Sequence, residues 1–96
     1  MQVRKERRFP KVEYDIRPGK VVNFGPRTRR ISRVIETNTS HITINPVGVR
    51  YVPVTKDADY DVIITPKSID VAVRRGRVAV IADFGDETVA YVLRGR

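Results

Sequence analysis

Proline interrupts this chain so often that no long helix fits into it. The interruptions in the middle of the sequence fall at Pro26, Pro46, Pro53 and Pro66. Proline lacks a backbone donor and clashes with the preceding helical turn, so a helix ends where it meets one. The proline-free tail is rich in valine, which favours strands. We therefore expect an all-β chain, with at most one helical turn at Thr65-Pro66, where threonine can cap and proline suits the first position.

Short β-branched runs between turn residues indicate the expected strands. They cover residues 21–24, 30–37, 41–45, 49–54, 60–65, 69–74, 77–83 and 88–93. Seven or eight short strands with frequent turns are typical of a small antiparallel barrel or sandwich, and the sequence leaves the choice between these two open. Arg75-Gly76 and Gly85-Asp86-Glu87 supply the last two turns. The final three runs are therefore predicted to form a three-stranded antiparallel meander.

The positive charge is concentrated near the N-terminal end of the sequence. The formal net charge is +8, of which the first thirty residues hold +7. The first twenty residues also contain few apolar side chains and two prolines, Pro10 and Pro18, each of which favours an extended residue before it. We divide the chain into an extended basic arm, residues 1–20, with at most a short strand over 12–16, and a single all-β domain, residues 21–96.

The sequence contains no arrangement of residues that indicates catalysis. Its one histidine, His41, falls on the outward face of an expected strand, where a lone histidine is usually a surface residue. Lys67 and Ser68 are adjacent, so on a strand they point to opposite faces and cannot form a Ser–Lys pair. There is no cysteine, and no glycine-rich phosphate loop follows a strand. We expect a protein that is not an enzyme and needs no cofactor.

Three alternating carboxylates, Asp57, Asp59 and Asp61, are the best candidates for metal ligands. Carboxylates at alternate positions can converge on calcium. The EF-hand loop also requires glycine at its sixth position and glutamate at its twelfth, where this chain has Val62 and Ser68. A solvated edge, or carboxylates that meet a basic neighbour, is the favoured interpretation. We therefore predict no metal site, although the sequence alone does not decide whether Asp57, Asp59 and Asp61 bind a cation.

Arginine outnumbers lysine fourteen to five, and it is clustered. A guanidinium group binds phosphate or carboxylate through two parallel hydrogen bonds, which lysine cannot do. Binding to an acidic partner or to phosphate is therefore predicted for the residues of three clusters: Arg4, Lys5, Arg7, Arg8, Arg27, Arg29, Arg30, Arg74, Arg75 and Arg77.

The charge and the absent catalytic residues favour a non-enzymatic structural subunit of a large assembly. A virion-type shell, cement or connector protein fits best, with the arm lying on acidic surfaces of neighbouring subunits in a homo- or hetero-oligomer. The alternative is a small nucleic-acid-binding β-barrel that contacts DNA or RNA phosphates with little sequence preference. A regulator that inserts its arm into the acidic cleft of an enzyme is neither favoured nor excluded.

Two further sequence features bear on location. No run approaches the eighteen or so apolar residues that span a bilayer, and no apolar segment follows the charged start as in a signal peptide. We expect a virion or intracellular location, without a signal peptide, a transmembrane segment or membrane contact.

Overall fold

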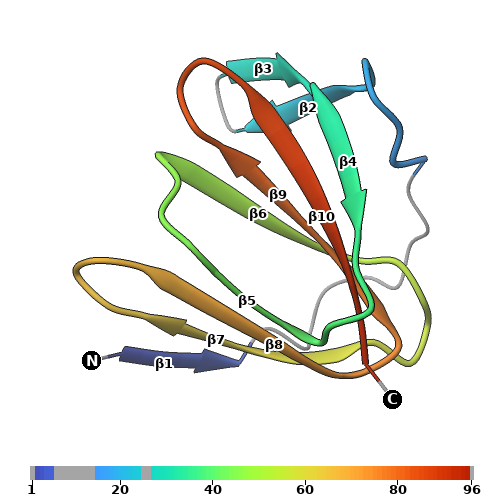
Figure 1. The fold of residues 1–96 in the computed structure, drawn as a ribbon, viewed down its shortest axis with the longest axis vertical. Coiled ribbons are helices and arrows are strands. Elements are labelled where there is room, and N and C mark those ends of the chain that lie inside the picture. The colour runs from blue at the N-terminus through green and yellow to red at the C-terminus, as the bar shows by residue number, and fades with distance from the viewer. Residues whose placement is uncertain (1, 6–14, 25–26, 96) are drawn as a thin grey trace.

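The computed structural model describes residues 2–5, 15–24 and 27–95, and this part of the chain forms strands and no helix (Figure 1). The strands are β1 (Gln2–Lys5), β2 (Val21–Phe24), β3 (Arg27–Arg30), β4 (Arg33–Glu36), β5 (His41–Ile44), β6 (Gly48–Pro53), β7 (Asp59–Ile64), β8 (Ile69–Arg75), β9 (Arg77–Asp83) and β10 (Thr88–Arg94). The prediction of an all-β fold is confirmed. Within the described ranges, no helix is long and apolar enough to cross a membrane.

The strands form two four-stranded sheets and a separate hairpin. The strand order is β1-β7-β8-β5 in one sheet and β4-β10-β9-β6 in the other, while β2 pairs with β3. Figure 1 shows the two sheets meeting at the end where β8 passes into β9. Two backbone hydrogen bonds close this end: Gly95 N to Gly76 O at 2.7 Å and Arg94 N to Thr39 O at 3.4 Å. The architecture is a sandwich.

The prediction of a closing three-stranded meander is wrong. β9 and β10 form the expected antiparallel hairpin, but β8 lies in the other sheet, where it pairs with β7 and β5. The reason is the Arg75-Gly76 turn. Gly76 adopts a left-handed φ of +73° against the loop that holds Thr55 and Asp57, and the chain turns there from one sheet into the other instead of folding back beside β8.

One strand pair also departs from the antiparallel prediction. β4 runs parallel to β10, with Arg33 opposite Val89 and Glu36 opposite Val92. The connection that follows β4 leads at once into β5 of the other sheet, so β4 has to end where the two sheets meet. β10 ends at the same place, and the two strands therefore point the same way.

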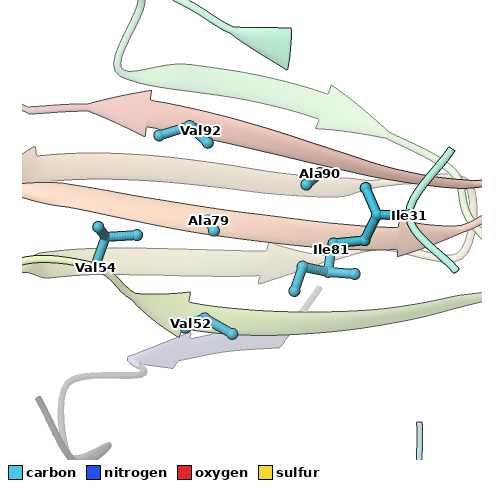
Figure 2. Close-up of a cluster of buried hydrophobic side chains, with 7 residues drawn as sticks. All are labelled: Ile31, Val52, Val54, Ala79, Ile81, Ala90 and Val92. Atoms are coloured by element: carbon cyan, nitrogen blue, oxygen red, sulfur yellow. The ribbon is translucent and has the colours of Figure 1, made fainter. Parts of the chain in front are cut away.

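The sheet β4-β10-β9-β6 is buried on both faces. One face packs on the other sheet through a cluster of Tyr60, Val62, Val71, Val73, Val78, Val80 and Leu93. The opposite face carries a second cluster, formed by Ile31, Val52, Val54, Ala79, Ile81, Ala90 and Val92 (Figure 2). Ile16 and Val22, which precede and begin the β2–β3 hairpin, pack against this second cluster. Burial on both faces explains why β9 is almost continuously apolar rather than alternating.

The helical turn that the sequence allowed at Thr65-Pro66 does not form. Thr65 does use its hydroxyl as a cap, because Oγ1 accepts hydrogen bonds from the N–H groups of Lys67 at 3.3 Å and Ser68 at 3.0 Å. However, Thr65 N also donates to Ser68 O at 2.9 Å. This bond closes a tight turn between the paired strands β7 and β8, which leaves no room for a helix.

Two parts of the predicted arm contact the domain. Gln2–Lys5 form β1, an edge strand that pairs antiparallel with β7. Ile16 is half-buried against the core, and Pro18-Gly19 then turns the chain with a hydrogen bond from Lys20 N to Arg17 O at 3.1 Å. Asp15 and Ile16 are not in a strand, and residues 12–14 of the short strand expected there lie outside the described residues, as do Arg7 and Arg8. The course of the arm between its two contacts stays a prediction.

Candidate functional site

Arg29, predicted to bind an external anion, is instead paired inside the molecule. Its Nε lies 3.4 Å from Oδ2 of Asp83, whose side chain is only 7% exposed. The other carboxylate oxygen of Asp83 accepts a hydrogen bond from Gly85 N at 2.9 Å. Because Arg29 is on β3 and Asp83 ends β9, this ion pair fastens the β2–β3 hairpin to the central sheet.

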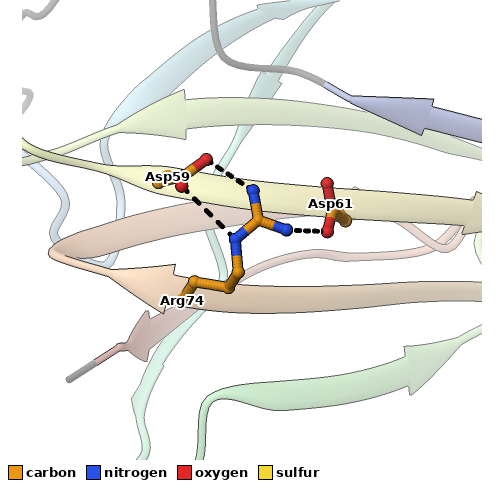
Figure 3. A network of polar contacts seen from close by, with 3 residues as sticks. All are labelled: Asp59, Asp61 and Arg74. Atoms are coloured by element: carbon orange, nitrogen blue, oxygen red, sulfur yellow. Dashed lines mark hydrogen bonds and ion pairs between the residues drawn. The ribbon is translucent and has the colours of Figure 1, made fainter.

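Arg74 is likewise held by two carboxylates of its own chain (Figure 3). Its Nη2 lies 2.8 Å and its Nε 3.3 Å from the two oxygens of Asp59, and its Nη1 donates to Asp61. The hydrogen bond with Asp59 raises the pKa of Arg74 most, the charge of Asp61 adds to this, and desolvation acts in the opposite direction. The guanidinium group therefore stays charged at every working pH.

The same contact bears on the candidate calcium ligands. Asp59 and Asp61 converge, but they converge on a guanidinium group from the neighbouring strand β8. Asp57 lies apart from them, on the loop against Gly76. In the described part of the chain, no three histidine, cysteine, aspartate or glutamate side chains gather as a metal site requires. The interpretation of these carboxylates as partners of a basic neighbour is confirmed for Asp59 and Asp61.

The other predicted anion-binding residues fall into different surroundings. Arg30 donates a hydrogen bond to Gly19 O at 3.3 Å, across the hairpin from its own strand. Arg4 and Lys5 are on β1, opposite Val62 and Asp61 in the backbone register. Arg27 begins β3, opposite Phe24. In the backbone register, Lys5 is therefore opposite the carboxylate residue Asp61 that Arg74 contacts, whereas Arg27, Arg29 and Arg30 are on the separate β2–β3 hairpin.

Two of the predicted residues, Arg75 and Arg77, have backbone positions near cations that the sequence prediction omitted, and Asp57 and Asp59 lie at the same corner of the fold. Arg75 ends β8, Arg77 begins β9, and Arg94 lies directly opposite Arg77 in the β9–β10 hairpin. Lys56 is exposed on the loop that packs against Gly76 between the two arginines. We call Lys56, Arg75, Arg77 and Arg94 the basic corner. Within the described ranges, none of these four side chains forms a salt bridge.

The backbone holds the basic corner in place. Arg77 N donates to Oγ1 of Thr55 at 2.9 Å, which fixes the Lys56 loop to the start of β9. Gly95 comes so close to β8 that a Cβ on it would lie 2.6 Å from the carbonyl carbon of Arg74. Like charges directly opposite each other in a hairpin are destabilising. Arg77 and Arg94 are opposite each other and repel. An anion bound between their side chains would offset this repulsion.

A separate pocket of about 290 Å³ lies beside the β2–β3 hairpin. Its apolar lining is formed by Ile16, Val21, Val22, Ile31, Val52 and Ile81, and its polar lining by Asp15, Lys20, Asn23 and Arg50. The polar groups are mostly engaged with one another. Lys20 Nζ lies 3.8 Å from Asp15, and Arg50 donates to the Asn23 carbonyl. Among the described residues, the basic corner differs from this pocket in that none of its four cations has a salt bridge.

Part of the basic corner could have been found from the sequence. The predicted pairing of the last two strands already places the start of one beside the end of the other, and with it Arg94 beside Arg77. The position of Lys56 could not be predicted in this way, because its loop lies next to Gly76 only where the chain passes from one sheet to the other. Comparisons with known protein families, curated proteins and solved structures found no match.

Proposed function

We propose that this protein is a non-enzymatic structural subunit of a large assembly, of the virion shell, cement or connector kind, and that its basic corner docks on an acidic surface of a neighbouring subunit. The observation that carries the proposal is that some arginines form ion pairs within the chain and others do not. Arg29 and Arg74 neutralise carboxylates of their own chain, whereas Arg75, Arg77 and Arg94 stand together without an ion pair among the described residues.

An acidic protein surface suits the corner better than a single-stranded nucleic acid does. Proteins that track single strands stack bases on exposed aromatic side chains. Tyr60 is buried in the core, and the half-buried Tyr51 packs on it with ring centroids 6.0 Å apart, so the ring of Tyr60 is not presented to a base. Carboxylates need no such platform, and two parallel hydrogen bonds from one arginine hold each of them.

Nucleic-acid binding remains the second candidate, and the opposed Arg77 and Arg94 favour it, since a backbone phosphate could lie between them. Four cations at one corner would contact about four phosphates of a duplex. The logarithm of the affinity would then fall with the logarithm of the salt concentration with a slope of about −3 to −4. A slope near zero on duplex DNA and on RNA removes this candidate.

Fractionation of a native extract by size, before and after nuclease treatment, tests both functions. A structural subunit is expected to migrate in particles far larger than one chain, and to stay there after the nucleic acid is digested. Release by nuclease supports nucleic-acid binding instead. Migration as a free single chain in both samples contradicts both.

Charge reversal at the corner tests which surface is responsible. We expect the double variant Arg75→Glu/Arg94→Glu to leave the large particles, because both side chains are exposed and the reversal repels a carboxylate surface. Lys67→Glu is the matched control: it reverses an exposed cation in the β7–β8 turn, at the far end of β8. Equal retention of the two variants contradicts a role for the corner, provided that both unfold in urea at the wild-type midpoint.

A further inference from the structure

β5 is an edge strand with an unusual sequence for its position. It pairs with β8 on one side, and no strand of the described chain pairs with its other side. Edge strands normally carry charged residues, proline or bulges that prevent another chain from adding to them. β5 reads His41-Ile42-Thr43-Ile44 and has no lysine, arginine, carboxylate or proline.

The other three edges of the two sheets are protected in the usual way. The strand β1 contains Arg4 and Lys5, and β4 begins with Arg33. β6 contains Arg50 and ends at Pro53. The contrast is sharpest in a chain of formal charge +8, since β5 is an edge at which two copies could meet without bringing charged strand residues together.

The hydrogen bonds to β8 determine which backbone groups of β5 face outward. Val73 N donates to Ser40 O at 2.7 Å, immediately before β5 begins. Antiparallel pairs alternate between bonded and non-bonded residues. Ile42 and Ile44 therefore bond to β8, and the N–H and C=O of His41 and Thr43 point away from it. The hydroxyl of Thr39 donates to His41 O at 3.2 Å, as expected for an outward carbonyl.

We propose that a second copy of this chain pairs with β5 along this edge, antiparallel, with Thr43 opposite Thr43 of the partner subunit. Each Thr43 N–H then donates to the other Thr43 C=O, which satisfies the two outward groups reciprocally. The pairing joins the two sheets β1-β7-β8-β5 into one sheet of eight strands across a two-fold axis. The paired residues of β5 include none of the four residues of the basic corner, although Arg94 N bonds to Thr39 O just before β5 begins, and the interface goes beyond the proposed function.

The alternation of isoleucine and threonine along β5 favours the register with Thr43 opposite Thr43 of the partner subunit. With Thr43 at the two-fold axis, Ile42 lies opposite Ile44 of the partner subunit, and the half-buried isoleucine face continues across the interface. The exposed Thr43 side chains meet on the other face, where threonine pairs are favourable. A shift by one residue would set isoleucine against threonine on both faces. The hydroxyl of Thr43 stays bonded to Asp70 at 2.6 Å, on its own sheet.

Proline at position 43 tests the interface. Thr43→Pro removes the outward N–H and no hydrogen bond to β8, so it is compatible with the edge of the folded chain. Thr43→Val is the matched control, because it also loses the hydroxyl but keeps the N–H. In sedimentation velocity at high salt, we expect the wild type and Thr43→Val to shift from one to two chain masses with rising concentration, and Thr43→Pro to stay at one. A wild type that stays monomeric, or a Thr43→Pro variant that associates equally well, overturns the proposal.

Hydrogen exchange of the wild type decides the matter if Thr43→Pro does not fold. The Thr43 amide should become protected as the concentration rises, whereas the Ile42 amide, which bonds to β8, should be protected at every concentration. A Thr43 amide that exchanges at the same rate throughout overturns the proposal. Arg75→Glu/Arg94→Glu should still form the dimer, so the result is independent of the test of the basic corner.

Discussion

At the scale of single residues, Gly76 combines an unusual backbone conformation with close packing. It has a left-handed φ of +73°, and a Cβ there would lie 2.7 Å from Oδ1 of Asp57 and 2.9 Å from the backbone of Ala58. Gly19 has a similar φ of +85°, but its Cβ would meet nothing within 4 Å. An alanine at Gly19 would therefore suffer only from the strained backbone conformation, whereas an alanine at Gly76 would also collide with its neighbours.

We predict that Gly76→Ala lowers the free energy of unfolding by on the order of 3 kcal/mol, from the left-handed backbone and the collision with the Thr55–Ala58 loop together. Gly19→Ala has only the backbone strain and should cost about 1–2 kcal/mol. Urea unfolding followed by circular dichroism measures both. Equal losses would show that the corner adjusts to the added carbon.

The pairing of Arg74 shows why residue-scale contacts escape sequence reasoning. The alternating Asp59 and Asp61 were visible as a carboxylate pair on one strand face, and so was the alternative of a basic neighbour. The identity of that neighbour depends on the register of β7 on β8, which includes an irregularity between Asp59 and Tyr60. A local pattern does not specify such a register.

At the scale of elements, the β2–β3 hairpin is attached to the central sheet by apolar contacts and by one ion pair. Arg29 and Asp83 are 25% and 7% exposed, so the pair is mostly shielded from water. Removal of the cation alone leaves a shielded carboxylate without its counter-charge, which costs more than removal of both partners.

We predict that Arg29→Met lowers the free energy of unfolding by about 1–2 kcal/mol, and that Asp83→Asn in the same chain restores part of it. A double-mutant cycle from urea unfolding should give a coupling of about 1 kcal/mol. Arg33→Met, which breaks the more exposed pair with Glu87, is the comparison and should have a smaller effect. Strict additivity of the Arg29 and Asp83 losses would contradict the pairing.

Elements with local signals were predictable, and their partners were not. The β9–β10 hairpin follows from two apolar runs around Gly85, which has a φ of +95°. The run that forms β8 looks like the first strand of the same meander, because its alternating Val71 and Val73 show which face is buried but not which sheet they belong to. The change of sheet at Gly76 depends on the distant Thr55–Ala58 loop, and no short-range pattern reports it.

At the scale of the whole molecule, the two core clusters share one sheet. Adjacent residues of β9 belong to different clusters: Val80 packs toward the sheet that contains β7 and β8, and Ile81 packs toward Ile31 and Ile16. A strand that contributes to both layers should prevent either from unfolding alone.

We predict that Val80→Ala and Ile81→Ala lower the free energy of unfolding by about 2–3 and about 3 kcal/mol, within a single transition. Circular dichroism and tyrosine fluorescence should give the same urea midpoint for each variant. An early, separate transition in Ile81→Ala would instead show that the layer around Ile31 is an independent unit.

The position of β10 between β4 and β9 determines when the fold can be completed during synthesis. A ribosome that has delivered every strand up to β9 has delivered a central sheet without its middle member, so β4 has no strand to pair with. The apolar residues of β9 meanwhile remain open to other chains, which is the situation in which nascent β proteins aggregate. The interval between the emergence of β9 and that of β10 is thus the period in which the apolar residues of β9 are most exposed to aggregation.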